Sequence, residues 1–272
     1  MDNLMEIRHV SKDFSHGVFR PSVTHAVKDV SFSLERGKTF GLVGGSGCGK
    51  TTLTRMISGL LSPTSGQILL NGKDITGLTG AARKHYHRQV QVVFQNPEAS
   101  LDPTMRIRDS LLEALEIHGI GSSKDERMNR ILEKLKLVAL PDYLLDRHPH
   151  QISGGEGQRL VICRALLLEP EILLLDEPTS MLDVSVQAHI MNILQRLQQE
   201  LGLTYLFITH DIELLGWISH RIGVMYQGQL VEAGPEIRLW STQVTPIPRG
   251  FYPPSGTGTR STHERIGTIS KF

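Results

Sequence analysis

The stretch Gly44-Gly45-Ser46-Gly47-Cys48-Gly49-Lys50-Thr51-Thr52 constrains the fold of this chain more than any other feature of its sequence. An apolar run at 40–43 precedes it and a helix-prone segment at 53–61 follows it. A strand, a glycine-rich turn and a helix in this order predict a phosphate-binding loop. The glycines let consecutive backbone N–H groups converge beside the positive end of the helix. Lys50 would then reach the β- and γ-phosphates of a nucleotide, and the Thr51 hydroxyl would bind Mg²⁺.

The composition excludes several classes of protein. The chain has 272 residues, of which 39% are hydrophobic, and its formal net charge of +1 leaves no electrostatic footprint for nucleic acid. Its two cysteines, Cys48 and Cys163, lie far apart, which argues against a disulfide framework and suits a reducing compartment. No apolar stretch approaches the ~18 residues of a membrane helix, and the N-terminus lacks the features of a signal peptide. We therefore expect a cytoplasmic protein that reaches a membrane only through a partner.

Short alternating segments flank the phosphate loop. Residues 5–10 and 26–34 predict strands, and residues 68–70 predict another that enters a tight turn at Asn71-Gly72. Residues 224–231 predict a hairpin. The segments at 5–10, 26–34 and 68–70 indicate a small, mainly antiparallel β layer around the phosphate-loop core.

The middle of the chain has a helical period. Between residues 105 and 140, Ser123 and Glu126 form the pattern of a capping box ahead of an apolar stripe. After Asp183 another amphipathic helix runs to Gly202. The first of these segments predicts a helical insertion between two strands of the core.

These segments give a simple domain organisation. One α/β domain would occupy residues 1–240, with a helical subdomain at about 100–168. Residues 241–272 are rich in Pro, Gly, Ser and Thr with little periodicity, which predicts an irregular tail.

Four apolar runs each end beside a polar group that phosphate chemistry can use. They are residues 40–43 before the phosphate loop, 90–94 before Gln95, 172–175 before Asp176 and Glu177, and 205–208 before Thr209 and His210. Continuous Val, Ile and Leu runs are typical of parallel strands buried on both faces. Ligands bind at the carboxyl ends of such strands, so we expect these polar groups to converge on one site.

Each polar group has a candidate role and a plainer alternative. Asp176 would act on Mg²⁺ through a water molecule, and Glu177 would orient or deprotonate the water that attacks the γ-phosphate. Gln95 would touch the metal or that water, and His210 would donate to the γ-phosphate. The alternatives are a surface turn at Asp176-Glu177-Pro178, a solvent-facing amide at Gln95 and an ordinary capping histidine.

A second anion-binding helix start lies at residues 152–158. Ser153 is a good N-cap, and Gly154 and Gly155 expose backbone N–H groups ahead of a helix at 158–168. One triphosphate does not need two such cradles from one chain. We infer that the second cradle serves a nucleotide held by another subunit.

In this order the motifs resemble those of the ATP-binding subunits of ABC transporters, over about residues 5–235. Walker A matches residues 44–52, and Walker B matches residues 172–177. The Q-loop matches Gln95, and the switch histidine matches His210. The signature matches Ser153-Gly154-Gly155 with Glu156, and the D-loop matches residues 180–183, which end at Asp183. The resemblance implies an α/β fold with a P-loop NTPase (RecA-like) core, a parallel sheet, an antiparallel β subdomain and a helical signature subdomain. It also implies that Phe14 stacks on adenine, with Phe19 as a nearby competitor.

The same resemblance implies an ATP hydrolase with several partners. Two ATP molecules and Mg²⁺ would lie between two ATPase subunits arranged head to tail, the second being a copy of this chain or a paralogue. The segment around Gln95 and the helical insertion would contact two transmembrane permease subunits, which an extracytoplasmic substrate-binding protein would serve. The ATPase would then lie on the cytoplasmic face of the membrane, without nucleic acid.

Within the family, the chain resembles the peptide/nickel importer group. The segments that carry this likeness are residues 34–38, 94–97, 100–103 and 182–186. Peptide-type members usually have a longer C-terminal region with a cysteine cluster, which this chain does not have. The nickel-type ATPase subunit is therefore expected, powering uptake of nickel or a nickel chelate, with a dipeptide or oligopeptide importer as the alternative.

Three residues depart from the family pattern. Glu156 stands where glutamine is usual, Gly157 where a longer side chain is common, and Met181 where a small residue is usual. A carboxylate suits a helix N-terminus, but at position 156 it would also lie near a triphosphate and weaken its binding.

Two other functions fit the sequence less well. ABC ATPases that act on chromosomes carry a long coiled coil between Walker A and Walker B, and those that act on ribosomes carry two ATPase domains. This chain has one set of motifs and no long heptad array. A nucleotide-binding regulator without turnover would lack Glu177 or His210, and both are present.

Overall fold

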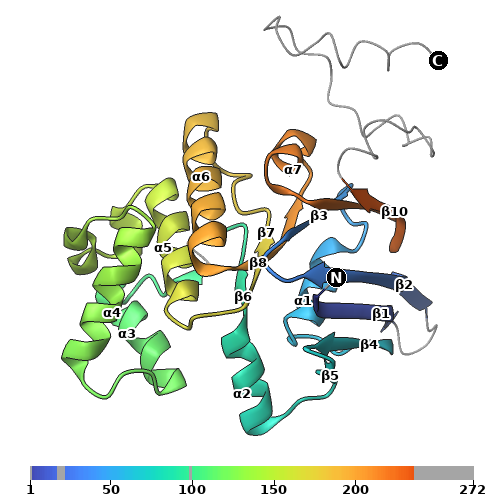
Figure 1. Ribbon diagram of the computed structural model, residues 1–272, viewed down its shortest axis with the longest axis horizontal. Coiled ribbons are helices and arrows are strands. Elements are labelled where there is room, and N and C mark those ends of the chain that lie inside the picture. Colours follow the sequence, from blue (N-terminus) through green and yellow to red (C-terminus); the bar gives the residue numbers. More distant parts are fainter. Residues whose placement is uncertain (1, 17–21, 98–99, 236–272) are drawn as a thin grey trace, which may run out of the picture.

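A computed structural model describes residues 2–16, 22–97 and 100–235, which form two β-sheets with helices around them (Figure 1). The larger sheet has the strand order β10-β9-β3-β8-β7-β6. Its strands are β3 (Thr39–Gly44), β6 (Val90–Val93), β7 (Ile172–Asp176), β8 (Thr204–Thr209), β9 (Arg221–Tyr226) and β10 (Gln229–Pro235). The smaller sheet has the order β2-β1-β4-β5, from β1 (Asn3–His16), β2 (Ser22–Glu35), β4 (Ser65–Leu70) and β5 (Lys73–Asp74).

The helices connect these strands and cover the larger sheet. They are α1 (Lys50–Ile57), α2 (Gly80–Gln89), α3 (Ile107–His118), α4 (Lys124–Leu137), α5 (Gly154–Leu166), α6 (Val184–Leu201) and α7 (Ile212–Ile218), with short 3₁₀ turns at Asp142–Asp146 and Pro149–Gln151. Helices α3, α4 and α5 lie on one side of the larger sheet, and the four-stranded sheet lies on the other (Figure 1).

The larger sheet confirms the predicted α/β core. Strands β6, β7, β8, β3 and β9 pair in parallel, and only β10 pairs antiparallel. Every residue of β7 and of β8 is buried, as their apolar runs predict for strands covered on both faces. The carboxyl ends of β3, β8, β7 and β6 therefore open on one edge.

The antiparallel layer is also present, but its first two strands are longer than predicted. The pairing of β1 with β2 shifts register several times, once between Ile7 and Val10, and both His9 and Asp29 have positive φ angles, of 51° and 50°. A bulge breaks the period of two, so Val27 and Val30 are both buried although they are three positions apart. Alternation therefore predicted only part of each strand.

Helix α1 lies between the two sheets. One apolar cluster joins Leu53, Met56 and Ile57 of α1 to residues of β1, such as Met5 and Ile7. The phosphate loop that begins α1 is thus anchored to both sheets at once, because its helix packs on each of them.

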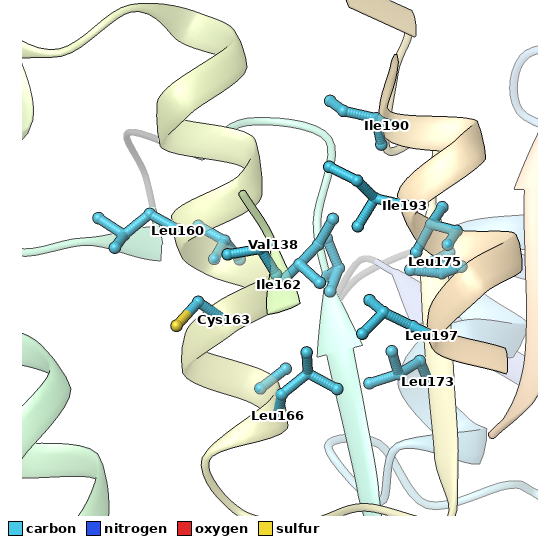
Figure 2. Close-up of a cluster of buried hydrophobic side chains, with 14 of the residues drawn as sticks. Val138, Leu160, Ile162, Cys163, Leu166, Leu173, Leu175, Ile190, Ile193 and Leu197 are labelled. Carbon is cyan, nitrogen blue, oxygen red and sulfur yellow. The ribbon is translucent and has the colours of Figure 1, made fainter. Parts of the chain in front are cut away.

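A second apolar cluster connects the helical region to the larger sheet. Figure 2 shows Ile162 and Leu166 of α5 facing Leu173 of β7 and Leu197 of α6. Because α5 begins with the signature residues and β7 ends at Asp176, this packing ties the position of the signature to that of the acidic pair.

Two local predictions need correction. The Ser123 side chain accepts a hydrogen bond from Glu126 N–H, but the Glu126 carboxylate accepts from Ser122 N–H and Oγ at 2.8 and 2.7 Å, not from Ser123. The second bond of the predicted capping box is therefore made with Ser122, one residue before the N-cap Ser123. Helix α5 begins at Gly154, four residues before the predicted start, because Ser153 and Glu156 complete a capping box there.

Within the three described ranges, no helix combines the length and the apolar character needed to cross a bilayer. The predicted tail at 241–272 and Phe19 lie outside the described residues.

Candidate active site

The phosphate loop connects β3 to α1 and is closed by its own lysine. Lys50 is only 7% exposed, and its Nζ donates to the backbone oxygens of Gly44 and Gly45 at 2.6 and 3.1 Å. An ammonium group with three donors can exchange such partners for phosphate oxygens at small conformational cost. The loop therefore holds a positive charge at the start of α1.

Two positions of the loop require glycine. Gly49 has φ of 109°, and a Cβ atom there would lie 2.4 Å from the backbone oxygen of Ala26. At Gly44 a Cβ would lie 2.5 Å from the backbone oxygen of Met225. The loop thus touches β2 on one side and β9 on the other, closer than any side chain permits.

A cavity of about 380 Å³ lies beside the loop. The loop contributes Gly47, Gly49, Lys50, Thr51 and Thr52; β2 and the turn after β9 contribute Thr24, His25, Ala26, Lys28, Gln227 and Gly228. The turn is held by a hydrogen bond from Gly228 N–H to the Cys48 backbone oxygen at 2.9 Å. Sequence reasoning missed the wall from β2, because nothing in its local pattern shows which ligand-binding loop it will border.

Phe14, the predicted adenine-stacking residue, lies next to this cavity rather than in its wall. It is half-buried on β1 and pairs across the sheet with Thr24, which does line the cavity. Lys12 places its Nζ 5.4 Å from the centre of the Phe14 ring. One face of that ring is therefore in contact with a cation already.

A second cavity, of about 240 Å³, adjoins the first at Thr51. Its wall consists of Thr51, Phe94, Gln95, Asn96, Ser100, Asp176 and Glu177. The structure thus brings together polar residues from the ends of β6 and β7 and from the start of α1, as the parallel arrangement of these strands predicts.

The acidic pair at the end of β7 has two different environments. Asp176 is 7% exposed, and burial followed by the charge of Glu177 raises its pKa, against the opposing effects of Lys50 and the Thr51 hydroxyl. Glu177 has φ of 50°, a strained value for a non-glycine residue and one that accompanies functional sites. His210 Nδ1 lies 3.3 Å from a Glu177 carboxylate oxygen.

Gln95 is held at the edge of this cavity. Its side-chain nitrogen donates to Ser180 Oγ at 3.0 Å, and Ser180 Oγ donates to the backbone oxygen of Glu177 at 3.2 Å. The Q-loop is therefore connected to the segment after the acidic pair. A change at Gln95 can reach Glu177 through two hydrogen bonds.

The signature residues form a separate surface. Ser153 and Gly154 are exposed, and neither lines the two cavities just described. Gly155 is buried, and its Cβ would lie 2.6 Å from Val186 of α6. Asp183 caps α6, with Oδ1 accepting from Val186 N–H at 3.0 Å. The signature turn and the D-loop are thus one packed unit.

Gly157 offers a test of local stability in this unit. A Cβ atom there would meet Pro97 at 3.5 Å and Ile152 at 3.7 Å, which are ordinary van der Waals distances. We expect Gly157→Ala to stabilise the protein by up to ~1 kcal/mol, through helix propensity, and to raise the unfolding temperature by about 2–4 °C. Thermal unfolding measures this. Gly155→Ala, which forces a Cβ against Val186, should lower that temperature instead, and a fall for Gly157→Ala would contradict the helical account.

Comparison with known proteins gives a consistent result. A family model described as ABC transporter matches residues 27–180. The oligopeptide transport ATP-binding protein OppF of Bacillus subtilis is 44% identical over 92% of this chain and 81% of its own length. The dipeptide transport ATP-binding protein DppF of Lactococcus lactis is 42% identical over 91% and 80%.

Two solved structures share the fold. The structure of cbiO1 from Clostridium perfringens, part of the ABC transporter complex cbiONQ, has a TM-score of 0.78 and 29% identity, over 89% of this chain and 92% of its own. The ATP-binding cassette MJ0796, solved as a dimer in a post-hydrolysis state with ADP and phosphate, has a TM-score of 0.76 and 29% identity, over 85% and 98%.

These relatives overturn one expectation. The nickel assignment is wrong: the relatives are named for oligopeptide and dipeptide transport. That assignment depended on the lack of a cysteine cluster at the C-terminus. An ATPase subunit need not touch the cargo, so its own motifs carry little information about what is transported.

The region that matches the family model contains the phosphate loop, Gln95, the signature and the acidic pair. The two transport relatives each align with more than nine tenths of this chain. The chain therefore belongs to the ABC transporter family, as an ATP-binding subunit that hydrolyses ATP.

Proposed function

We propose that this chain powers a peptide importer by binding and hydrolysing ATP on behalf of separate permease subunits. The observation that carries the proposal is the likeness, at 44% identity over 92% of the chain, to a relative named for oligopeptide transport. Two cavities joined at Thr51 supply a place for the nucleotide and for its reacting phosphate.

The larger cavity accommodates the nucleotide. Lys50 exchanges the Gly44 and Gly45 oxygens for the β- and γ-phosphates, and the N–H groups of the loop cradle the same anions. Phe14 stacks on adenine from the edge of β1, next to the Thr24 wall of the cavity. The remaining loop residues, Gly45, Ser46, Cys48 and Thr52, shape the cradle.

The smaller cavity suits Mg²⁺. Its wall contains two groups whose oxygen atoms can bind a metal ion, the Thr51 hydroxyl and the Asp176 carboxylate, and these already interact with each other. The Gln95 amide lines the same wall. Hard oxygen ligands of this kind are those that Mg²⁺ prefers, and the ion would neutralise charge on the phosphates. Thr51 and Gln95 would bind it directly and Asp176 through a water molecule.

Hydrolysis then depends on Glu177. Its carboxylate accepts a proton from, or orients, a water whose oxygen attacks the γ-phosphorus, and the bond to the ADP oxygen breaks. His210, 3.3 Å from that carboxylate, is placed to donate a hydrogen bond to the γ-phosphate. Gln95 links this machinery to the helical region through Ser180.

The second subunit completes the site. Ser153 and Gly154 are exposed on a turn that does not face this chain's own two cavities. Beside it, the apolar side chains of Met181 and Val184 are 67% and 81% exposed. Exposed apolar residues next to an anion-binding helix start suit an interface with a second nucleotide-bound subunit. Ser153 then donates to the γ-phosphate that the partner subunit holds.

A groove of about 340 Å³ suits the permease. Residues of α2, β6, α3 and α5 line it, including Val92, Phe94, Ile117 and Val161. Phe94 and Ile117 are 37% and 55% exposed, and Phe94 lies one residue before Gln95. A permease helix seated here would act on Gln95 directly.

An extracytoplasmic binding protein would deliver the peptide, and the ATPase would lie on the cytoplasmic face of the membrane. Residues 241–272 would form a tail beyond the ATPase domain.

Peptide uptake by cells that express the complete transporter tests this proposal. We expect ATP-dependent uptake of a labelled oligopeptide, and expect Ile117→Glu to reduce it by at least about tenfold, because a buried unpaired charge costs on the order of 1–3 kcal/mol or more at an apolar contact. The purified Ile117→Glu subunit should still bind ATP normally. Val231→Glu serves as control, because Val231 is an exposed apolar residue, at 44%, on the edge strand β10.

Two results would contradict the proposal. A transporter that moves no peptide, although its subunits copurify, would remove peptides as cargo. Normal uptake by the Ile117→Glu variant would remove the groove as the permease contact.

A further inference from the structure

The carboxylate of Glu156 already holds the hydroxyl group that the proposed function requires for the partner's nucleotide. Ser153 Oγ donates to Glu156 Oε2 at 2.8 Å, and Ser153 N–H donates to the same oxygen at 2.8 Å. In return, Glu156 N–H donates to Ser153 Oγ at 3.3 Å. A serine hydroxyl has one proton. While these bonds persist, Ser153 has no proton to donate to a phosphate.

The bond is charge-assisted. Donation from Ser153, first through its backbone N–H and then through its hydroxyl, lowers the pKa of Glu156, so the carboxylate is ionised at neutral pH. Hydrogen bonds to an ionised acceptor are roughly twice as strong as neutral ones. Arg159 lowers the pKa of Glu156 as well, yet its guanidinium donates to the backbone oxygens of Gly155 and Ala139. The carboxylate thus keeps its negative charge beside Ser153.

The backbone of the signature turn is restricted by its packing against neighbouring residues. Gly154 packs so closely that a Cβ would lie 3.3 Å from Leu182, and at Gly155 it would lie 2.6 Å from Val186. Leu182 belongs to the D-loop, and Val186 belongs to the first turn of α6. The hydroxyl of Ser153 becomes available only if the side chain of Glu156 releases it.

We propose that Glu156 is a positioning residue that acts as a latch on Ser153. The triphosphate bound to a second copy of this chain must displace the Glu156 carboxylate before Ser153 can donate to the γ-phosphate. The latch therefore raises the ATP concentration at which two subunits pair, and isolated subunits stay apart more readily than subunits that a permease holds together. This inference rests on the proposed contact between the signature and the partner's nucleotide.

Association of the full chain with itself in MgATP tests the latch, in a Glu177→Gln background that prevents hydrolysis. Glu156→Gln keeps a side-chain oxygen for Ser153 N–H, since glutamine also completes a capping box, but it removes the charge. We expect the ATP concentration for half-maximal dimerisation, measured by light scattering, to fall by about tenfold, as a charge-assisted bond becomes a neutral one. In a Ser153→Ala background the same substitution should change that concentration by less than about threefold, because no latched hydroxyl remains.

The chain provides a matched control in Glu126. Its carboxylate makes the same pair of bonds, from Ser122 N–H and Oγ, at the start of α4. Glu126→Gln should leave the ATP concentration for dimerisation unchanged. The latch is wrong if Glu156→Gln needs as much ATP for dimerisation as its parent. It is also wrong if the effect of Glu156→Gln persists in full in the Ser153→Ala background. Neither result would contradict the pairing of two subunits. If the Glu177→Gln parent does not associate at any ATP concentration, the contact between subunits fails together with the latch.

Discussion

Glu177→Gln is expected to bind MgATP as tightly as the unmodified chain, to hydrolyse it about 10²- to 10³-fold more slowly and to accumulate as an ATP-bound dimer. Glutamine has nearly the same shape as glutamate but cannot accept the proton of the attacking water, and a general base contributes on the order of 10²–10⁴ in rate. Glu177 is well placed for this task. It lines the cavity that Thr51 and Asp176 share, and its positive φ is a strained value of the kind that accompanies functional sites.

Single-turnover ATP hydrolysis and size-exclusion chromatography in MgATP measure the two effects. Glu213→Gln is the matched control, because Glu213 is an exposed carboxylate in the first turn of α7, close in sequence to His210. It should leave turnover unchanged. Turnover by Glu177→Gln within about threefold of the unmodified chain would remove Glu177 from the role of general base, since that factor is far below what a lost base costs.

Lys50→Met is expected to weaken ATP binding by about hundredfold or more. Hydrogen bonds that involve a charged group contribute roughly 1.5–3 kcal/mol each, and the ammonium would make one to each of the β- and γ-phosphates. Methionine keeps the unbranched apolar stem that occupies this buried position, so the loop should remain packed. The carbonyl groups of Gly44 and Gly45 lose their donor, which we expect to cost about 1 kcal/mol of stability each.

Titration with a fluorescent ATP analogue measures the affinity, and circular dichroism checks that the variant is folded. Lys73→Met, at an exposed position of β5, controls for the loss of one positive charge. Binding by Lys50→Met within about threefold of that control would show that the lysine does not reach the phosphates, because a lost charged hydrogen bond costs more than this.

Much of the core could be predicted from local patterns. The runs before Asp176 and His210 predicted parallel strands buried on both faces, because an uninterrupted apolar run is typical of such strands. The run before Gln95 contains Gln91, and its strand β6 is parallel but lies at the edge of the sheet and is only partly buried. The order of polar groups after those strands also placed Thr51, Asp176 and Glu177 near one another, since parallel strands end at the same edge of a sheet. The strand boundaries at β1 and β2 could not be predicted, as bulges at His9 and Asp29 break the alternation.

The cargo could not be predicted from the residues of the site. The motifs that the sequence predicts for the site all concern ATP, so the nickel and peptide interpretations differed only in features far from these motifs. The identity of the relatives corrected that reading.

By itself the sequence predicted which residues would meet the phosphates, because each of them follows a strand or begins a helix and local geometry sets its placement. Only the tertiary structure decided which other residues line the cavity beside the phosphate loop and which hydrogen bonds the predicted site residues make. The wall at Thr24–Lys28, the bond from Gln95 to Ser180 and the bond from Ser153 to Glu156 all depend on side-chain or strand contacts. Such contacts form when the chain packs, and the short-range pattern of residue types does not encode their geometry.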